Sequence, residues 1–83
     1  MPAKFVRQAE SFAKTYSKLD LSIREKLDKL IAKAAQNPQI GKPMKYTRKG
    51  TRELYLGPFR LSYYYDEIEE IIAFLDLYHK DEQ

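Results

Sequence analysis

Residues 51–66 read TRELYLGPFRLSYYYD, and this stretch decides the fold. The pair Gly57-Pro58 divides it into two runs of alternating residues, which is typical of two strands joined by a turn. In the second run, one face would carry Phe59, Leu61, Tyr63 and Tyr65. The other face would carry Arg60, Ser62 and Tyr64. Because an unpaired arginine is expensive to bury, we expect the first face to pack on a core and the second to meet solvent or a partner.

Two amphipathic helices are predicted before this pair of strands. Apolar residues recur at helical spacing over 9–19 and again over 23–34. Ser22 and Glu25 fit a capping box, which predicts that the second helix starts there. Asn37 precedes a proline and so disfavours helix, which predicts the end of the second helix.

The remaining segments complete an α+β domain. EEIIAFLDLYH at 69–79 is rich in β-branched and aromatic residues and predicts a third strand, after a turn at 66–70. AKFVRQ at 3–8 is either a short N-terminal edge strand or a lead-in. This order predicts an N-terminal helix hairpin packed on one face of a small antiparallel sheet. With 83 residues, the chain is expected to form one domain spanning 1–83.

The composition argues against several classes of site. The chain has no cysteine and one histidine, so we expect no disulfide, no metal site and no cofactor. Its N-terminus lacks a long apolar stretch, and no run is long enough to span a bilayer. A soluble, cytoplasmic protein with no membrane partner is the expectation.

Basic residues concentrate in the middle of the chain. Between residues 42 and 60 there are six basic residues and one acid, Glu53. The basic residues are Lys42, Lys45, Arg48, Lys49, Arg52 and Arg60. From residue 61 to the end there are seven acids and one lysine. A basic block of this kind predicts a polyanionic partner.

The ordered combination of these features resembles the RelE/ParE superfamily of small bacterial and archaeal toxins. The similar segments are GKPMKY (41–46), KGTRELYLGPFRLSYYYD (49–66) and IIAFLDLYHKDEQ (71–83). In that family a helix hairpin and a glycine near a turn precede an aromatic-Arg pair that opens a strand, and a polar tail follows the last apolar strand. Here the pair is Phe59-Arg60, with Tyr63 soon after it. The GKP motif and the terminal Tyr-His pair resemble the YoeB branch in particular.

The resemblance implies a toxin that binds a cognate antitoxin. In the RelE, YoeB and HigB branches the toxin cleaves messenger RNA, usually in the ribosomal decoding site, whereas in the ParE branch it poisons DNA gyrase. A degenerate member that only binds antitoxin is a third alternative. By position, Arg60 matches the phosphate-binding arginine of the RNases, and His79 matches the terminal histidine of the YoeB-like branch. Two residues depart from that branch: Met44-Lys45 stands where its catalytic glutamate is expected, and Lys80 stands where it has a tyrosine.

The chemistry of RNA cleavage identifies the candidate catalytic residues. Cleavage without a metal uses the 2′-hydroxyl of the RNA as nucleophile, helped by a base, a cation on the phosphorane oxygens and an acid at the leaving 5′-oxygen. Acid or base assistance is worth roughly 10²–10⁴-fold. Arginine grips phosphate in two places and histidine exchanges protons near neutral pH, so Arg60 and His79 are the catalytic candidates. Further catalytic candidates are Lys45, Lys49, Tyr64 and Lys80. Because His79 is expected just past the end of the last strand, it would reach the edge of the open sheet face.

The RNA-binding residues are expected to lie near that face. Lys42, Lys45, Lys49 and Arg52 would contact phosphates without reading the base sequence. Tyr64 is the member of its tyrosine run that alternation leaves outside the core, so it is the candidate for stacking on a base. Two alternatives stay open: Arg60 pairs with Glu53 or Asp76 across the sheet, and the basic block is an ordinary solvated loop.

Overall fold

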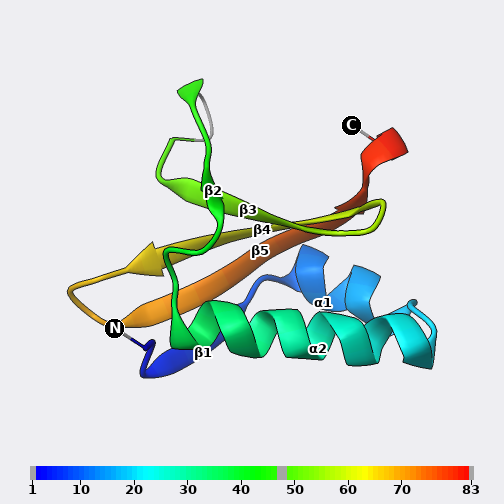
Figure 1. Cartoon of the computed structure of the whole chain (residues 1–83), viewed down its shortest axis with the longest axis horizontal. Coiled ribbons are helices and arrows are strands. Elements are labelled where there is room, and N and C mark those ends of the chain that lie inside the picture. Colours follow the sequence, from blue (N-terminus) through cyan, green and yellow to red (C-terminus); the bar gives the residue numbers. More distant parts are fainter. Residues whose placement is uncertain (1, 47–48, 83) are drawn as a thin grey trace.

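The computed structural model describes residues 2–46 and 49–82 of the chain. Within these residues the elements are β1 (Phe5–Gln8), α1 (Glu10–Ser17), α2 (Leu21–Gln36), β2 (Lys42–Pro43), β3 (Thr51–Leu56), β4 (Phe59–Asp66), β5 (Ile71–His79) and the 3-10 turn η2 (Lys80–Glu82). The described strands form one sheet in the order β1-β5-β4-β3-β2. Both helices lie on the same side of this sheet (Figure 1). The predicted α+β fold, with a helix hairpin packed on a sheet, is confirmed.

The two edges of the sheet add detail that the sequence left open. Residues 5–8 form an edge strand, β1, which runs parallel to β5 with Phe5 opposite Ile71. The helix hairpin and strands β2 to β4 all lie between β1 and β5 in the chain, which provides the long connection that a parallel pair requires. The pairings among β2, β3, β4 and β5 are antiparallel, as predicted. At the other edge, Lys42 and Pro43 form β2, which the sequence did not indicate because two residues carry no periodic pattern.

The start of α2 differs from the prediction. Asp20 is the N-cap, and its side-chain Oδ1 accepts a hydrogen bond of 3.0 Å from the backbone N–H of Ile23. Ser22 lies inside the first turn, where its hydroxyl donates to the same Oδ1 at 2.9 Å. The predicted capping box of Ser22 and Glu25 is therefore wrong. A carboxylate one position before the helix satisfies one of the free N–H groups and also complements the positive end of the helix dipole.

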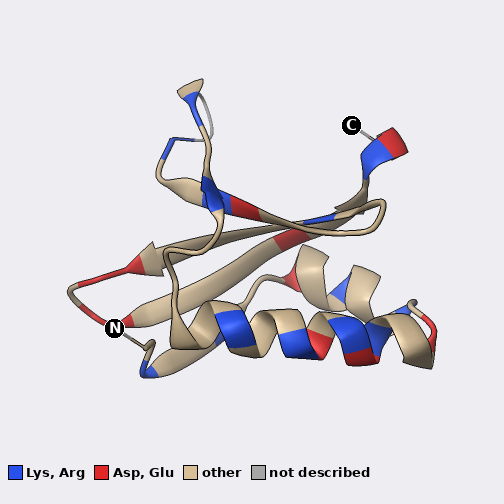
Figure 2. Cartoon of the chain, viewed as in Figure 1, with Lys and Arg blue, Asp and Glu red and all other residues tan. Residues whose placement is uncertain are grey.

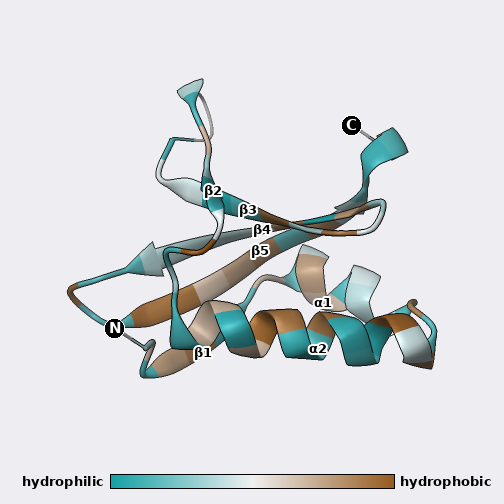
Figure 3. Ribbon diagram, in the orientation of Figure 1, coloured by the Kyte–Doolittle hydropathy of each residue, from teal (hydrophilic) through white to brown (hydrophobic). Residues whose placement is uncertain are grey.

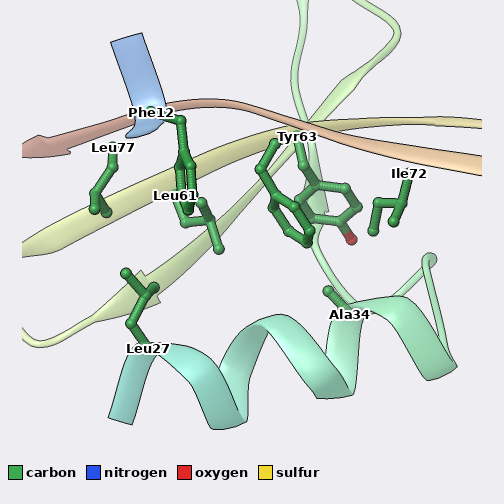
Figure 4. Close-up of a cluster of buried hydrophobic side chains, with 8 residues drawn as sticks. Phe12, Leu27, Ala34, Leu61, Tyr63, Ile72 and Leu77 are labelled. Atoms are coloured by element: carbon green, nitrogen blue, oxygen red, sulfur yellow. The ribbon is translucent and has the colours of Figure 1, made fainter. Parts of the chain in front are cut away.

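The core lies between the sheet and the two helices. Its buried members are Phe12, Leu27, Ala34, Leu61, Tyr63, Ile72, Phe74 and Leu77. Side chains from both helices and from the two central strands converge there (Figure 4), and β5 is apolar along much of its length (Figure 3). The alternation predicted for β4 is confirmed, since Leu61 and Tyr63 are buried while Arg60 and Tyr64 are not.

A bulge in β5 changes which side chains share a face. Ser62 lies opposite Asp76, but the next residue, Tyr63, lies opposite Phe74, so Leu75 is an extra residue in β5. The hydroxyl of Ser11 in α1 donates a hydrogen bond of 2.8 Å to the carbonyl of this extra residue. Because side chains alternate along a strand, one inserted residue exchanges the faces of all residues that follow it.

Candidate functional site

We call the side of the sheet opposite the helices the open face. Residues directly opposite each other on adjacent strands lie on the same face, so the register identifies its members. One row consists of Tyr55, Arg60 and Tyr78. The next row consists of Lys42, Glu53, Ser62 and Asp76. A third row consists of Thr51, Tyr64, Ala73 and Arg7. The segment after β2 and the turn η2 both project beyond the sheet on this side (Figure 1).

Arg60 lies in the first row, between two tyrosines. Its guanidinium carbon is 4.3 Å from the centre of the Tyr55 ring, a cation–π contact from β3. Tyr78 is its neighbour on the other side, from β5. The guanidinium also makes long hydrogen bonds to the carbonyls of Gly57, at 3.4 Å, and Phe59, at 3.5 Å. Among the described residues, these partners of Arg60 are two carbonyls and a ring, none of which carries a negative charge, which suits a cation that binds an anion.

The alternative partners expected for Arg60 have other roles. Glu53 lies in the next row, and its Oε2 accepts a hydrogen bond of 2.6 Å from the hydroxyl of Tyr78. Glu53 is 4% exposed, which is unusual for a carboxylate on an uncovered sheet face. Asp76 is exposed, and its Oδ1 accepts from the backbone N–H of Leu77. The sequence did not indicate Glu53, Tyr78 or Tyr55 as site residues, although the period-2 pattern of β3 placed Glu53 and Tyr55 together.

His79 lies on the other side of the sheet from Arg60. It is the last residue of β5, not the residue after it, and it lies opposite Phe59. The two rings meet edge to face, with centroids 5.6 Å apart. His79 Nδ1 accepts a hydrogen bond of 3.2 Å from the backbone N–H of Asp81 and is 3.5 Å from a carboxylate oxygen of the same residue. The bulge therefore brings Tyr78, rather than His79, next to Arg60.

The end of the chain is tied to the β3–β4 turn. The backbone N–H of Lys80 donates a hydrogen bond of 2.8 Å to the carbonyl of Pro58. This bond directs η2 across the end of the hairpin. The side chain of Lys80 is exposed, so it is available to a partner at this end of the sheet.

The predicted RNA-binding residues divide among three locations. Lys42, Lys45 and Lys49 are exposed around β2 and the segment that follows it (Figure 2), whereas Arg48 lies outside the described residues. Tyr64 is 43% exposed on the open face, two residues along β4 from Ser62. The structure does not bring Arg52 together with this group. Its guanidinium donates to the carbonyls of Gly41, at 2.8 Å, and Gln39, at 3.2 Å, so it holds the α2–β2 connection in place.

Within 2–46 and 49–82, no group of three or more His, Cys, Asp or Glu side chains is arranged to hold a metal ion. In the same residues, no helix has the length and apolar character needed to cross a membrane.

Comparison with solved structures shows that this fold recurs in toxins. The chain is similar to a chain of the RelBE2 toxin–antitoxin complex from Mycobacterium tuberculosis, with 23% identity, coverage of 95% of this chain and 93% of that chain, and a TM-score of 0.83. A YoeB/ParE toxin from Agrobacterium tumefaciens is 18% identical over 90% of this chain and 96% of that chain, with a TM-score of 0.81. The intact E. coli RelBE toxin–antitoxin complex contains a chain that is 20% identical over 88% of this chain and 92% of its own, with a TM-score of 0.77.

Comparison of the sequence with family models and curated proteins adds the family. A search of curated protein sequences found no match. The family model described as the ParE toxin of the type II toxin–antitoxin system parDE matches residues 3–83. Because this match covers nearly the whole chain, the protein belongs to the family of ParE toxins of type II toxin–antitoxin systems.

Proposed function

We propose that this toxin is a ribosome-dependent endoribonuclease that cleaves messenger RNA in the cytoplasm and so inhibits translation. The observation that carries the proposal is the position of Arg60. Its guanidinium is held on an uncovered sheet face, stacked on Tyr55 and next to Tyr78. A planar cation among exposed aromatic rings suits single-stranded RNA, because it binds the phosphate while the rings stack on the bases.

The proposed reaction is a transesterification that requires no metal. The 2′-oxygen forms a bond to phosphorus, the bond from phosphorus to the 5′-oxygen breaks, and the products are a 2′,3′-cyclic phosphate and a free 5′-hydroxyl. Arg60 stabilises the charge on the phosphorane oxygens. Tyr64, exposed on the same face, stacks on a base, and Lys42, Lys45 and Lys49 bind flanking phosphates.

His79 is proposed to protonate the leaving 5′-oxygen from the end of the sheet. Its side chain is 34% exposed, so it can exchange protons with solvent. Its ring partner Phe59 directly precedes Arg60, so the two candidate groups flank the start of β4 from opposite sides. Because the 5′-oxygen and the oxygens bound by Arg60 belong to the same phosphorus, this role requires the His79 ring to turn around the end of the sheet toward the open face.

An antitoxin is the proposed protein partner. The similar structures from M. tuberculosis and E. coli are toxin–antitoxin complexes, and the family is defined by such pairs. We expect a cognate antitoxin, encoded beside this gene, to suppress the activity.

The second candidate is inhibition of DNA gyrase without catalysis. Two observations favour it: the matching family model is that of ParE, and His79 does not share a face with Arg60. In that case the open face would bind a protein or DNA surface and would need no proton transfer.

One induction experiment separates the two candidates. If the toxin is a nuclease, its expression produces new 5′ ends within translated messages, and blocking translation initiation suppresses them. DNA breaks and an SOS response with intact messages would instead support gyrase inhibition.

Cleavage of a message on programmed ribosomes tests Arg60 directly. We expect Arg60→Ala to lower cleavage on programmed ribosomes by roughly 10²-fold or more, and Arg60→Lys to restore it only in part, because a point charge cannot replace the two-pronged grip. Lys29→Ala removes an exposed cation from α2, on the other side of the sheet, and serves as the control for loss of one positive charge. Full activity of Arg60→Ala would exclude this residue as the phosphate-binding group.

A further inference from the structure

A buried carboxylate lies behind a tyrosine at the centre of the open face. Glu53 Oε2 and the Tyr78 hydroxyl are 2.6 Å apart, which is short for a hydrogen bond between oxygens. At 4% exposure, Glu53 cannot contact a bound RNA strand. Tyr78 is only partly buried, so part of its side chain is open to a bound strand.

The register shows where the two side chains meet. Glu53 belongs to β3 and Tyr78 to β5, and β4 runs between them. Glu53 lies opposite Ser62, and Tyr78 lies opposite Arg60. Adjacent strands are about 4.8 Å apart, so the two side chains must reach over β4 to form their hydrogen bond. The phenol oxygen is therefore held over β4, between Arg60 and Ser62.

The contact is well suited to moving a proton. A phenol oxygen that donates its own proton to one group can accept a proton from another. Tyr78 already donates to a carboxylate, so a proton that arrives at its oxygen can be matched by one that leaves toward Glu53. The short distance means that neither oxygen has to move far. The charge that develops during proton transfer is shared by the Tyr78 and Glu53 oxygens. These are already hydrogen-bonded, so the surrounding groups need little rearrangement.

We infer that Tyr78 and Glu53 form a proton relay that serves as the base of the reaction; this inference rests on the proposed function. As the RNA 2′-oxygen attacks phosphorus, its proton passes to the oxygen of Tyr78, and the proton of Tyr78 passes to Glu53. The electron pair of the broken bond stays on the 5′-oxygen, which takes a proton from His79 or from water. Glu53 afterwards releases its proton to water, through Tyr78, and the site is restored.

Two conservative variants test the relay in single-turnover cleavage on programmed ribosomes. Tyr78→Phe keeps the ring but removes the oxygen, and Glu53→Gln keeps the size of the side chain but removes the proton acceptor. We expect each to lower the cleavage rate by roughly 10²–10⁴-fold, the range of general-base assistance. The double variant should lose no more than the stronger single variant, because the two groups act as one unit. Binding of a message methylated at the reacting 2′-oxygen should be unchanged.

The chain offers a matched control. In Tyr16, the hydroxyl donates a hydrogen bond of 2.6 Å to a carboxylate oxygen of Asp28, but this pair lies on the helices. Tyr16→Phe therefore removes the same kind of contact away from the open face. We expect it to cleave at the wild-type rate.

Solvent isotope effects give a readout that a structural role would not change. In mixtures of light and heavy water, two protons in motion give a curved dependence of the rate on deuterium content. We expect that curve for the wild type and its loss in Glu53→Gln, which is checked for folding by circular dichroism. If the wild type cleaves and both variants cleave equally fast, the relay is excluded and the nuclease stands. If either variant is slow only because it binds the methylated message more weakly, the pair is structural and the relay is excluded. If the folded wild type does not cleave at all, the proposed function fails, and the relay fails with it.

Discussion

At the scale of single residues, Tyr63 links the sheet to the loop that follows α2. Its side chain is fully buried; its hydroxyl donates to the carbonyl of Pro38 at 2.6 Å and accepts from the N–H of Gly41 at 2.9 Å. A Cβ at Gly41 would lie 2.7 Å from the Tyr63 oxygen and 2.9 Å from the Cβ of Arg52. Glycine is therefore required there by close packing against the tyrosine. The GKP motif carries this structural role in addition to any role in binding.

Replacing Tyr63 by phenylalanine tests this link. We expect Tyr63→Phe to lower the free energy of unfolding by roughly 1–3 kcal/mol at neutral pH, because two buried backbone groups lose their partner. Burial raises the pKa of Tyr63 above its usual value of 10.0. The folded protein thus keeps this proton after the unfolded chain has lost it, so the contribution is complete below about pH 10 and is lost as the pH rises through the folded pKa. Urea titrations of both proteins between about pH 7 and pH 11 measure the effect.

The control for this experiment is Tyr64→Phe, which alters the adjacent, exposed tyrosine. It should leave the unfolding curves unchanged. An alkaline loss of stability of equal size in wild type and Tyr63→Phe would show that other groups cause it.

At the scale of elements, the start of α2 depends on a single carboxylate. Asp20 receives hydrogen bonds from the backbone of Ile23 and the hydroxyl of Ser22. The first of these is the main reason that the pKa of Asp20 is lowered from its usual value of 3.8. The hydroxyl of Ser22 donates to the same carboxylate oxygen, and the N-cap itself is Asp20.

Comparing Asp20→Ala with Ser22→Ala tests which residue caps the helix. We expect Asp20→Ala to lower the melting temperature more, because it leaves the N–H of Ile23 without its acceptor. A carboxyl whose folded pKa is lowered contributes stability above its unfolded pKa, and this is lost as the pH falls through the folded pKa. The difference between wild type and Asp20→Ala should therefore shrink below about pH 4. Thermal denaturation at neutral pH measures both variants. If Ser22→Ala lowers the melting temperature more than Asp20→Ala does, the capping box is supported after all.

At the scale of the whole molecule, charge is distributed unevenly. Lys and Arg side chains occupy α2 and the region around β2, whereas acids gather in the turn between β4 and β5 (Figure 2). The two basic regions lie on opposite sides of the sheet, since α2 covers one side and the segment after β2 projects from the other (Figure 1). Binding of a polyanion to the open face should therefore depend on the basic residues around β2 and not on those of α2.

Two triple variants distinguish these regions. We expect Lys42→Gln, Lys45→Gln and Lys49→Gln together to weaken binding to ribosomes that carry a methylated, uncleavable message. The slope of log affinity against log salt should fall by about 2, from roughly 0.7 for each of three lost phosphate contacts on a single strand. Lys26→Gln, Lys29→Gln and Lys33→Gln remove the same charge from the exposed side of α2 and should change the slope little. Equal effects of the two variants would mean that net charge alone governs binding.

Local patterns were sufficient to predict both helices, strands β3 to β5 and the core side of β4. Helical spacing identified α1 and α2, and alternation in residues 59–66 placed Leu61 and Tyr63 inside and Arg60 and Tyr64 outside, as the structure shows. These features depend on residues close together in the chain, because an element that buries one face has apolar residues at the period of that helix or strand. The sequence therefore determined the fold class and the face on which Arg60 lies.

The composition of the candidate site was decided by tertiary structure. The bulge at Leu75, whose carbonyl binds Ser11 of α1, places Tyr78 beside Arg60 and turns His79 toward Phe59. Glu53 belongs to the site because β3 and β5 both lie next to β4, which allows its side chain to reach Tyr78. Each of these contacts joins residues that are distant in the chain, so no local period records them. A single extra residue in a strand is enough to exchange its two faces, and only the packing of the helix against the sheet decides where that residue is accommodated.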